Sequence, residues 1–81
     1  MKIEQLAPNQ IVVTDEEKGE KFFQSYDSRI VKIDFNGKVT LGRDWKYSAT
    51  TSRHRSKFLG ETTKKTQRKL DSGEYAYDEN L

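Results

Sequence analysis

The chain of 81 residues contains no cysteine and only one proline, one histidine and one methionine. The absence of cysteine excludes disulfide bonds and every zinc or iron–sulfur site that needs thiolate ligands. No run of 18 or more apolar residues occurs, so the sequence predicts no membrane-spanning helix. A basic start followed by an apolar segment is also missing, which argues against a secretory signal. We therefore expect a cytoplasmic protein without a membrane partner.

The length fits one small domain with a thin core, because so short a chain buries little surface. Only 32% of the residues are hydrophobic, whereas 35% are charged. Most of the isoleucine, valine and phenylalanine falls within residues 11–41. We expect a single domain over residues 1–81, with 1–47 mainly β, 48–73 mainly helical and basic, and 74–81 as a tail.

The first of two predicted hairpins comprises residues 10–15, which are β-branched, and residues 21–26. A polar turn over 16–19 joins them. Neighbouring side chains of a strand point to opposite faces, so Phe22 and Phe23 are expected on different faces of the sheet.

The second predicted hairpin has the strongest strand signal in the chain, residues 29–35, where apolar and polar side chains alternate. Asn36 and Gly37 follow, a pair typical of a type I′ turn. Residues 38–41 form the return strand. The apolar face is expected to hold Val31, Ile33, Phe35, Val39 and Leu41.

The two ends of the chain are less patterned. The turn signal of Pro8 and Asn9 predicts a short lead-in that packs Ile3 or Leu6 onto the core. Residues 74–77 have strand-like alternation, and they either add to the sheet or lie over the helices.

The second half contains helix signals. Residues 48–52 offer several N-caps for a helix over residues 53–59, and Gly60 is a typical helix stop. Thr62 or Thr63 then caps a second helix, unless residues 51–71 form a single one. Strands followed by helices predict the α+β class, here a small antiparallel sheet of about four strands and one or two C-terminal helices.

Positive charge is concentrated between Arg43 and Lys69, where nine basic residues face two acidic ones, a net charge of +7. Three interpretations are open: a solvated helical face, a surface that contacts phosphates, or a surface complementary to an acidic protein. No signature of base-specific recognition occurs. The residues proposed to contact a partner are Arg53, Arg55, Lys57, Lys64, Lys65, Arg68 and Lys69.

Two aromatic residues, Trp45 and Tyr47, connect the sheet to the basic segment. The simplest interpretation is that Trp45 covers the thin core. The alternative is that both residues anchor a partner, because Trp and Tyr are enriched at interface hot spots.

Signals for catalysis are weak. No glycine-rich phosphate loop occurs, and the single histidine, His54, has no evident nucleophile or orienting carboxylate. We expect a protein that is not an enzyme and that holds no cofactor or metal.

The middle of the chain resembles small proteins encoded by bacteriophages and prophages, a family of unknown function. The resemblance covers roughly residues 25–75. The residues that carry it are Ser25-Tyr26-Asp27-Ser28, Ile33-Asp34, Gly37-Lys38-Val39, Trp45-Lys46-Tyr47-Ser48, Thr50-Thr51-Ser52, Phe58-Leu59-Gly60-Glu61, Lys65 to Leu70 and Ser72-Gly73-Glu74-Tyr75.

This resemblance implies a phage accessory protein in the cytoplasm of a bacterial host. Such proteins often bind and inhibit a host protein or a protein–nucleic-acid complex, for example a CRISPR effector. The alternative is a small protein that binds nucleic acid non-specifically through its basic segment, residues 53–69. The sequence leaves the oligomeric state open; self-association would point to a virion assembly protein.

Overall fold

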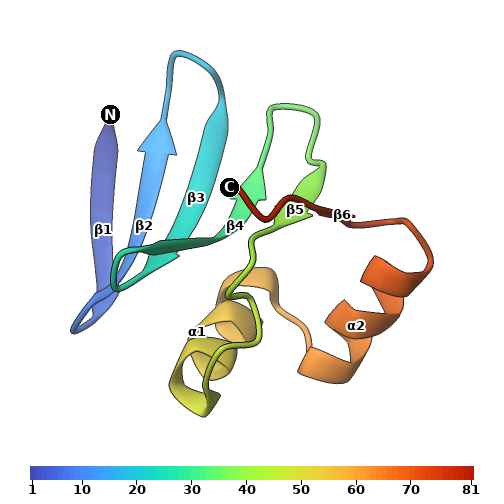
Figure 1. Ribbon diagram of the computed structural model, residues 1–81. Coiled ribbons are helices and arrows are strands. Elements are labelled where there is room, and N and C mark those ends of the chain that lie inside the picture. Colours follow the sequence, from blue (N-terminus) through green and yellow to red (C-terminus); the bar gives the residue numbers. More distant parts are fainter.

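The computed structural model describes all 81 residues and consists of one sheet with two helices on one side (Figure 1). Strands come first and helices later, apart from one short terminal strand, so the predicted α+β class is confirmed. The elements are β1 (Lys2–Ala7), β2 (Gln10–Asp15), β3 (Glu20–Ser25), β4 (Ser28–Ile33), β5 (Val39–Leu41), α1 (Ala49–Leu59), α2 (Thr63–Asp71) and β6 (Ala76–Tyr77).

The sheet has six strands rather than the expected four, and their spatial order follows the chain from β1 to β6. The first five strands pair antiparallel with their neighbours, whereas β6 runs parallel to β5. The extra strands lie at the two ends of the chain, where the sequence pattern did not fix the pairing: β1 has six residues and β6 has two.

The first extra strand, β1, was predicted as a lead-in that packs an apolar side chain onto the core. That prediction was wrong: Ile3 is 65% exposed and Leu6 is 39% exposed. An edge strand is held by its backbone hydrogen bonds to one neighbour, so it can form without burying its side chains. β1 therefore leaves its outer edge and its apolar residues in solvent.

The second extra strand, β6, comes from the tail whose position the sequence left open. Ala76 pairs with Thr40, and Tyr77 pairs with Leu41. The backbone N–H of Asp78 also donates to the carbonyl of Leu41, over 2.9 Å. The tail therefore joins the sheet beside β5 and becomes the terminal strand at that end.

Both predicted hairpins are present, with differences at the second turn. β4 ends at Ile33, so Phe35 lies beyond the strand and is 75% exposed, not on the apolar face. The turn is not type I′, because Asn36 does not have the positive φ that this type requires. Instead the Asp34 carboxylate accepts hydrogen bonds from the N–H groups of Asn36 and Lys38, both over 2.9 Å.

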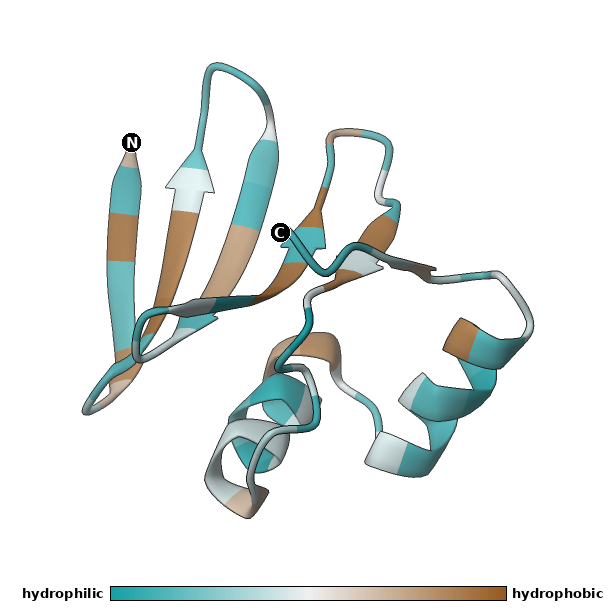
Figure 2. Cartoon of the chain, viewed as in Figure 1, coloured by the Kyte–Doolittle hydropathy of each residue, from teal (hydrophilic) through white to brown (hydrophobic).

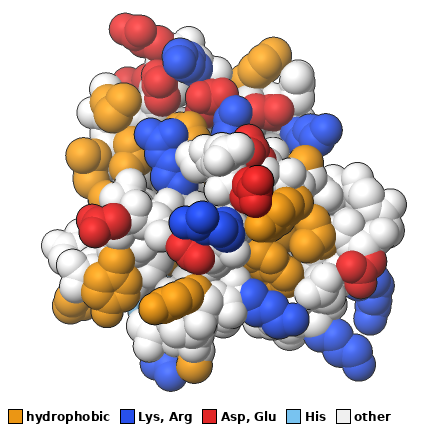
Figure 3. All heavy atoms as spheres, viewed as in Figure 1, with side chains coloured by type: hydrophobic (Ala, Val, Ile, Leu, Met, Phe, Trp, Pro, Cys, Tyr) orange, Lys and Arg blue, Asp and Glu red, His pale blue; other side chains and the backbone are white.

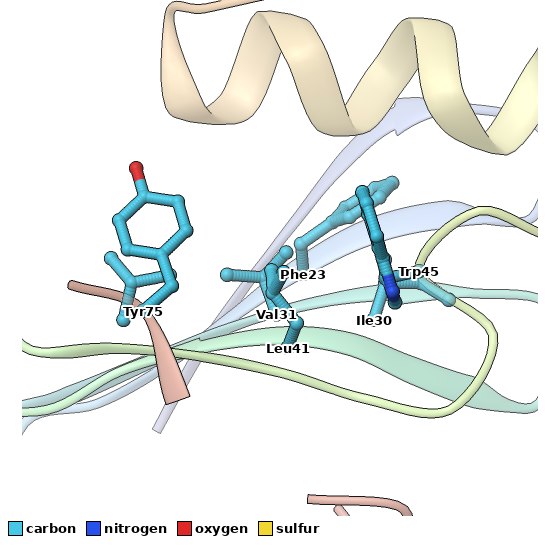
Figure 4. Packing of buried hydrophobic residues seen from close by; sticks show 7 residues of the cluster. Phe23, Ile30, Val31, Leu41, Trp45 and Tyr75 are labelled. Atoms are coloured by element: carbon cyan, nitrogen blue, oxygen red, sulfur yellow. The ribbon is translucent and has the colours of Figure 1, made fainter. Parts of the chain in front are cut away.

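The core lies between the sheet and the helices (Figure 4). As predicted, the two neighbouring phenylalanines of β3 differ: Phe23 is buried and Phe22 is only half-buried. An irregularity opposite Phe23 allows two consecutive residues of β4, Ile30 and Val31, to be buried together. The buried hydrophobic residues are Phe23, Ile30, Val31, Val39, Leu41, Trp45 and Tyr75.

The basic segment forms two helices, which resolves the open choice between one and two. Ser48 caps α1 and Thr62 caps α2. Gly60 ends α1 with a φ of 71°, a left-handed conformation that glycine adopts without steric cost. Phe58 of α1 stacks on Phe23 with ring centroids 5.7 Å apart.

Both helices are mostly hydrophilic, and Phe58, Leu59 and Leu70 are the helix residues that pack against the core (Figure 2). Neither helix is long and apolar enough to cross a membrane.

Candidate functional site

The outer face of α2 carries three exposed cations, Lys64, Lys65 and Arg68, which we call the α2 basic face. The helix buries Thr66 on its other side and places Leu70 against the core. Positions 64 and 68 are one turn apart, so their side chains are neighbours on the outer surface. Figure 3 shows Lys and Arg side chains at the lower right of the molecule, where α2 lies in Figure 1.

None of these three cations forms an ion pair within the chain. The salt bridges of the protein involve only Lys32 and Lys69 as cations. Asp71, the acidic residue of α2, accepts a hydrogen bond from Gln67 over 2.9 Å instead of pairing with a cation. The α2 basic face therefore presents uncompensated positive charge to solvent.

Lys46 extends this charged surface, although it was not among the residues predicted to contact a partner. Its ammonium donates to the Oε1 of Gln67 over 3.3 Å, which brings the turn before α1 against α2. The signal in the sequence was weak, since Lys46 lies outside the predicted helices. Only the packing of the 43–47 turn against α2 adds this cation to the face.

The two exposed cations of α1, Arg53 and Lys57, are not part of the α2 basic face. Lys57 borders a hollow of about 320 Å³ between α1 and β1–β4, together with His54, Phe58 and Glu4. Arg53 is exposed to solvent. Because the chain turns at Gly60, a single basic stripe along residues 51–71 does not form.

Arg55 does not belong to the predicted surface, because it is fully buried. Its guanidinium donates to the backbone carbonyl of Trp45 and, over 2.6 Å, to the hydroxyl of Thr63. Burial lowers the pKa of Arg55, and the nearby Glu61 carboxylate counters that effect. Arg55 is therefore a structural tie between the 43–47 turn, α1 and the start of α2.

Lys69 is likewise held inside the protein's own network. Its ammonium lies 3.0 Å from Glu61 and 3.7 Å from Glu74. The hydrogen bond to Glu61 raises the pKa of Lys69. Lys69 is thus compensated within the chain, which separates it from the three cations of the α2 basic face.

Glu61 is the centre of this network, with a side chain only 4% exposed. Tyr75 donates to its Oε1 over 2.6 Å, and Thr66 donates to its Oε2 over 2.7 Å. Burial by itself would raise the pKa of Glu61, but these hydrogen bonds and the one from Lys69 lower it by more. The pKa of Tyr75 is raised, first by burial and then by its bond to Glu61.

The two aromatic residues before α1 differ in position. Trp45 is 7% exposed and belongs to the core, which was the simplest interpretation of the sequence, whereas Tyr47 is 78% exposed. Tyr47 borders a hollow of about 540 Å³ with Tyr26, Asp27 and Ser48. Of these two residues, only Tyr47 has a side chain that a partner could contact.

The structure contains no group of three or more His, Asp or Glu side chains close enough to share a metal ion. His54 is half-buried and borders the same hollow as Lys57.

No curated protein and no solved structure shows significant similarity to the chain. The profile of a family of unknown function, DUF8033, matches residues 1–74, a longer stretch than the resemblance over 25–75. Because this match covers most of the 81 residues, the protein belongs to this family of unknown function.

Proposed function

We propose that this protein is a non-enzymatic binding protein that uses the α2 basic face to engage an acidic surface of another macromolecule. The observation that carries the proposal is the absence of any internal ion pair at Lys64, Lys65 and Arg68. Exposed cations on one short helix create a local positive potential that attracts and orients an acidic partner.

In its most concrete form, the protein is a phage accessory protein that binds and inhibits a host protein or a protein–nucleic-acid complex in the bacterial cytoplasm. Inhibition of a defence system such as a CRISPR effector is one such role. The resemblance of residues 25–75 to small phage proteins supports this form. Tyr47 supports it as well, because an exposed aromatic residue next to a polar hollow can provide a buried anchor at an interface.

A charge-reversed variant tests the proposal. The triple variant K64E/K65E/R68E inverts the α2 basic face at exposed positions, so the fold is expected to persist. The matched control K18E/K21E/K38E makes the same change in charge at three exposed lysines of the sheet and its turns. Each tagged protein is used to capture partners from bacterial lysate, with and without nuclease.

The wild-type protein and the control are expected to retain a stoichiometric protein partner after nuclease treatment, and the triple variant to lose it. Loss of all capture after nuclease would instead favour the alternative, non-specific binding of nucleic acid. In that case the affinity for duplex DNA should fall with salt with a logarithmic slope of about −3, one counterion for each of the three cations.

The inhibitory role has its own readout. Bacteria that carry an active CRISPR system are infected with a targeted phage while they express each protein. The wild-type protein and the control are expected to increase the plaquing efficiency, and the triple variant is not. Equal plaquing with the wild-type protein and with an empty vector would contradict inhibition of that defence system.

A further inference from the structure

The outer edge of β1 is an unprotected strand edge. β1 is the terminal strand of the sheet, so the backbone groups that face away from β2 have no partner strand. Residues 2–5 pair regularly with β2, and the irregularity comes only between Gln5 and Ala7. Pro8, which could block pairing, lies after the strand. A regular segment is therefore free to accept another strand.

The charged side chains of this segment, Lys2 and Glu4, form no ion pair inside the chain, although Glu4 borders the hollow that Lys57 also lines. Lys2 lies opposite Thr14 and Glu4 lies opposite Val12, so neither has a charged neighbour across the β1–β2 pair. Neither forms a salt bridge elsewhere. The two charges alternate with Ile3, which points to the other face and is 65% exposed.

We propose that β1 pairs antiparallel with β1 of a second copy of this chain, around a two-fold axis at Ile3. In that register Lys2 of each copy lies opposite Glu4 of the other, which gives two cross-strand pairs of opposite charge. Ile3 lies opposite Ile3, so the two exposed apolar side chains cover each other. The same surface of both copies forms the interface, as two-fold symmetry requires.

Other symmetric registers of the same strand are less favourable. An axis at Glu4 places Glu4 directly opposite Glu4, and an axis at Lys2 does the same with the lysines, so like charges face each other. An axis at Gln5 places the irregularity between Gln5 and Ala7 inside the new ladder. Only the axis at Ile3 combines a regular backbone with charge complementarity.

The fold leaves room for this pairing. α1 packs against β3 through Phe58 and Phe23, and β1 is at the end of the sheet opposite β5 and β6 (Figure 1). The interface thus uses none of the residues of the α2 basic face. The dimer goes beyond the proposed function and does not depend on it.

Sedimentation equilibrium from about 1 μM to about 1 mM covers the range in which a small interface dissociates. The wild-type protein is expected to convert from monomer to dimer in this range. K2E and E4K each replace two attractive pairs by two repulsive ones, so each should weaken the dimer roughly tenfold or more. The swapped variant K2E/E4K restores both pairs and should dimerise like the wild type, and a mixture of K2E with E4K chains should form heterodimers.

Cross-linking tests the register directly, because the chain has no native cysteine. The two copies of I3C would face each other at a Cα separation of about 4.5–5.5 Å, which a disulfide can bridge. The two copies of Q5C would be about 14 Å apart, from four residues of rise and one strand spacing, which is too far. I3C is therefore expected to form the covalent dimer much faster than Q5C.

A monomer at every concentration would overturn the proposal. A dimer that is unaffected by both K2E and E4K, or that cross-links equally through I3C and Q5C, would overturn the Ile3 register. All substitutions are at exposed positions, and the fluorescence of the buried Trp45 checks that each variant is folded. The variant K64E/K65E/R68E should dimerise normally, so failure of the dimer and failure of the proposed function are distinguishable.

Discussion

Replacing Tyr75 by phenylalanine removes one hydroxyl group from the network around Glu61 and leaves the aromatic ring in the core. The hydroxyl donates to Oε1 of Glu61 over 2.6 Å, and Tyr75 is only 8% exposed. A hydrogen bond to a charged group contributes about 1.5–3 kcal/mol to stability. Lys69 and Thr66 still satisfy the carboxylate, so we expect a loss near the lower limit, about 1.5–2 kcal/mol.

A loss of this size lowers the melting temperature by roughly 10 °C in a domain of this length. Urea unfolding followed by the fluorescence of Trp45, the single tryptophan, measures the change in the free energy of unfolding. Tyr77→Phe is the matched control: Tyr77 is 50% exposed, and no side-chain hydrogen bond of the chain involves its hydroxyl. The control should unfold at the wild-type urea concentration.

The effect of Tyr75→Phe should also depend on pH. Burial tends to raise the pKa of Glu61, but its hydrogen bonds bring the pKa of the folded state below the ordinary value of 4.5. A lowered pKa means that the ionised carboxylate stabilises the fold above the ordinary value and that this stability is lost as pH falls through the folded value. Because Tyr75 donates to that carboxylate, the difference between wild type and variant should be full at pH 7 and smaller at pH 3.

Two results would refute this reasoning. One is a variant as stable as the wild type at pH 7, which would mean that the bond to Glu61 contributes nothing. The other is an equal difference at both pH values, which would assign the effect to ring packing. A double-mutant cycle with Glu61→Gln measures the coupling free energy between the Tyr75 hydroxyl and the Glu61 charge, which should be near zero if the effect comes from ring packing.

Three further substitutions test the packing that positions the helices, each by urea unfolding. In Gly42→Ala, the new Cβ would lie 2.3 Å from the backbone oxygen of Arg29, so the free energy of unfolding should fall by about 2–3 kcal/mol. Wild-type stability of this variant would contradict the close approach. Gly60→Ala meets no neighbouring atom but must adopt a φ of 71°, so it should cost only about 1–2 kcal/mol, and a larger loss would indicate a contact that the structure lacks. Arg55→Lys cannot keep the forked hydrogen bonds that include Thr63, so the free energy of unfolding should fall by about 2–3 kcal/mol. An unchanged urea midpoint would show that Arg55 does not hold these segments together.

The candidate site was only partly predictable from sequence. Three of the four α2 cations, Lys64, Lys65 and Arg68, are exposed as expected, because a helix with one aliphatic residue must leave most of its surface in solvent. Lys69 was expected beside them but is paired with Glu61 and Glu74. Arg55 carried the same charge signal and is buried. Its burial depends on the carbonyl of Trp45 and the hydroxyl of Thr63, which lie on other segments of the chain.

Local sequence determined the strands of residues 10–33 and the ends of the helices, because turn formers, alternating apolar and polar residues, and N-caps act through the backbone of neighbouring residues. The start of α1 is the exception, since the helix was expected from residue 53 and begins at Ala49. The serine at position 48 and the glycine at position 60 mark α1 without help from distant contacts.

The tertiary structure alone decided which charges stay free. Lys69 finds Glu61 and Glu74 once α2 and the tail pack together, whereas the cations of the α2 basic face meet no acid. It also decided that β1 is a free edge, since strand pairing joins distant backbone groups and leaves one side of a terminal strand without a partner. Composition and spacing cannot distinguish a paired charge from a free one, because the pairing depends on side chains that meet only after folding.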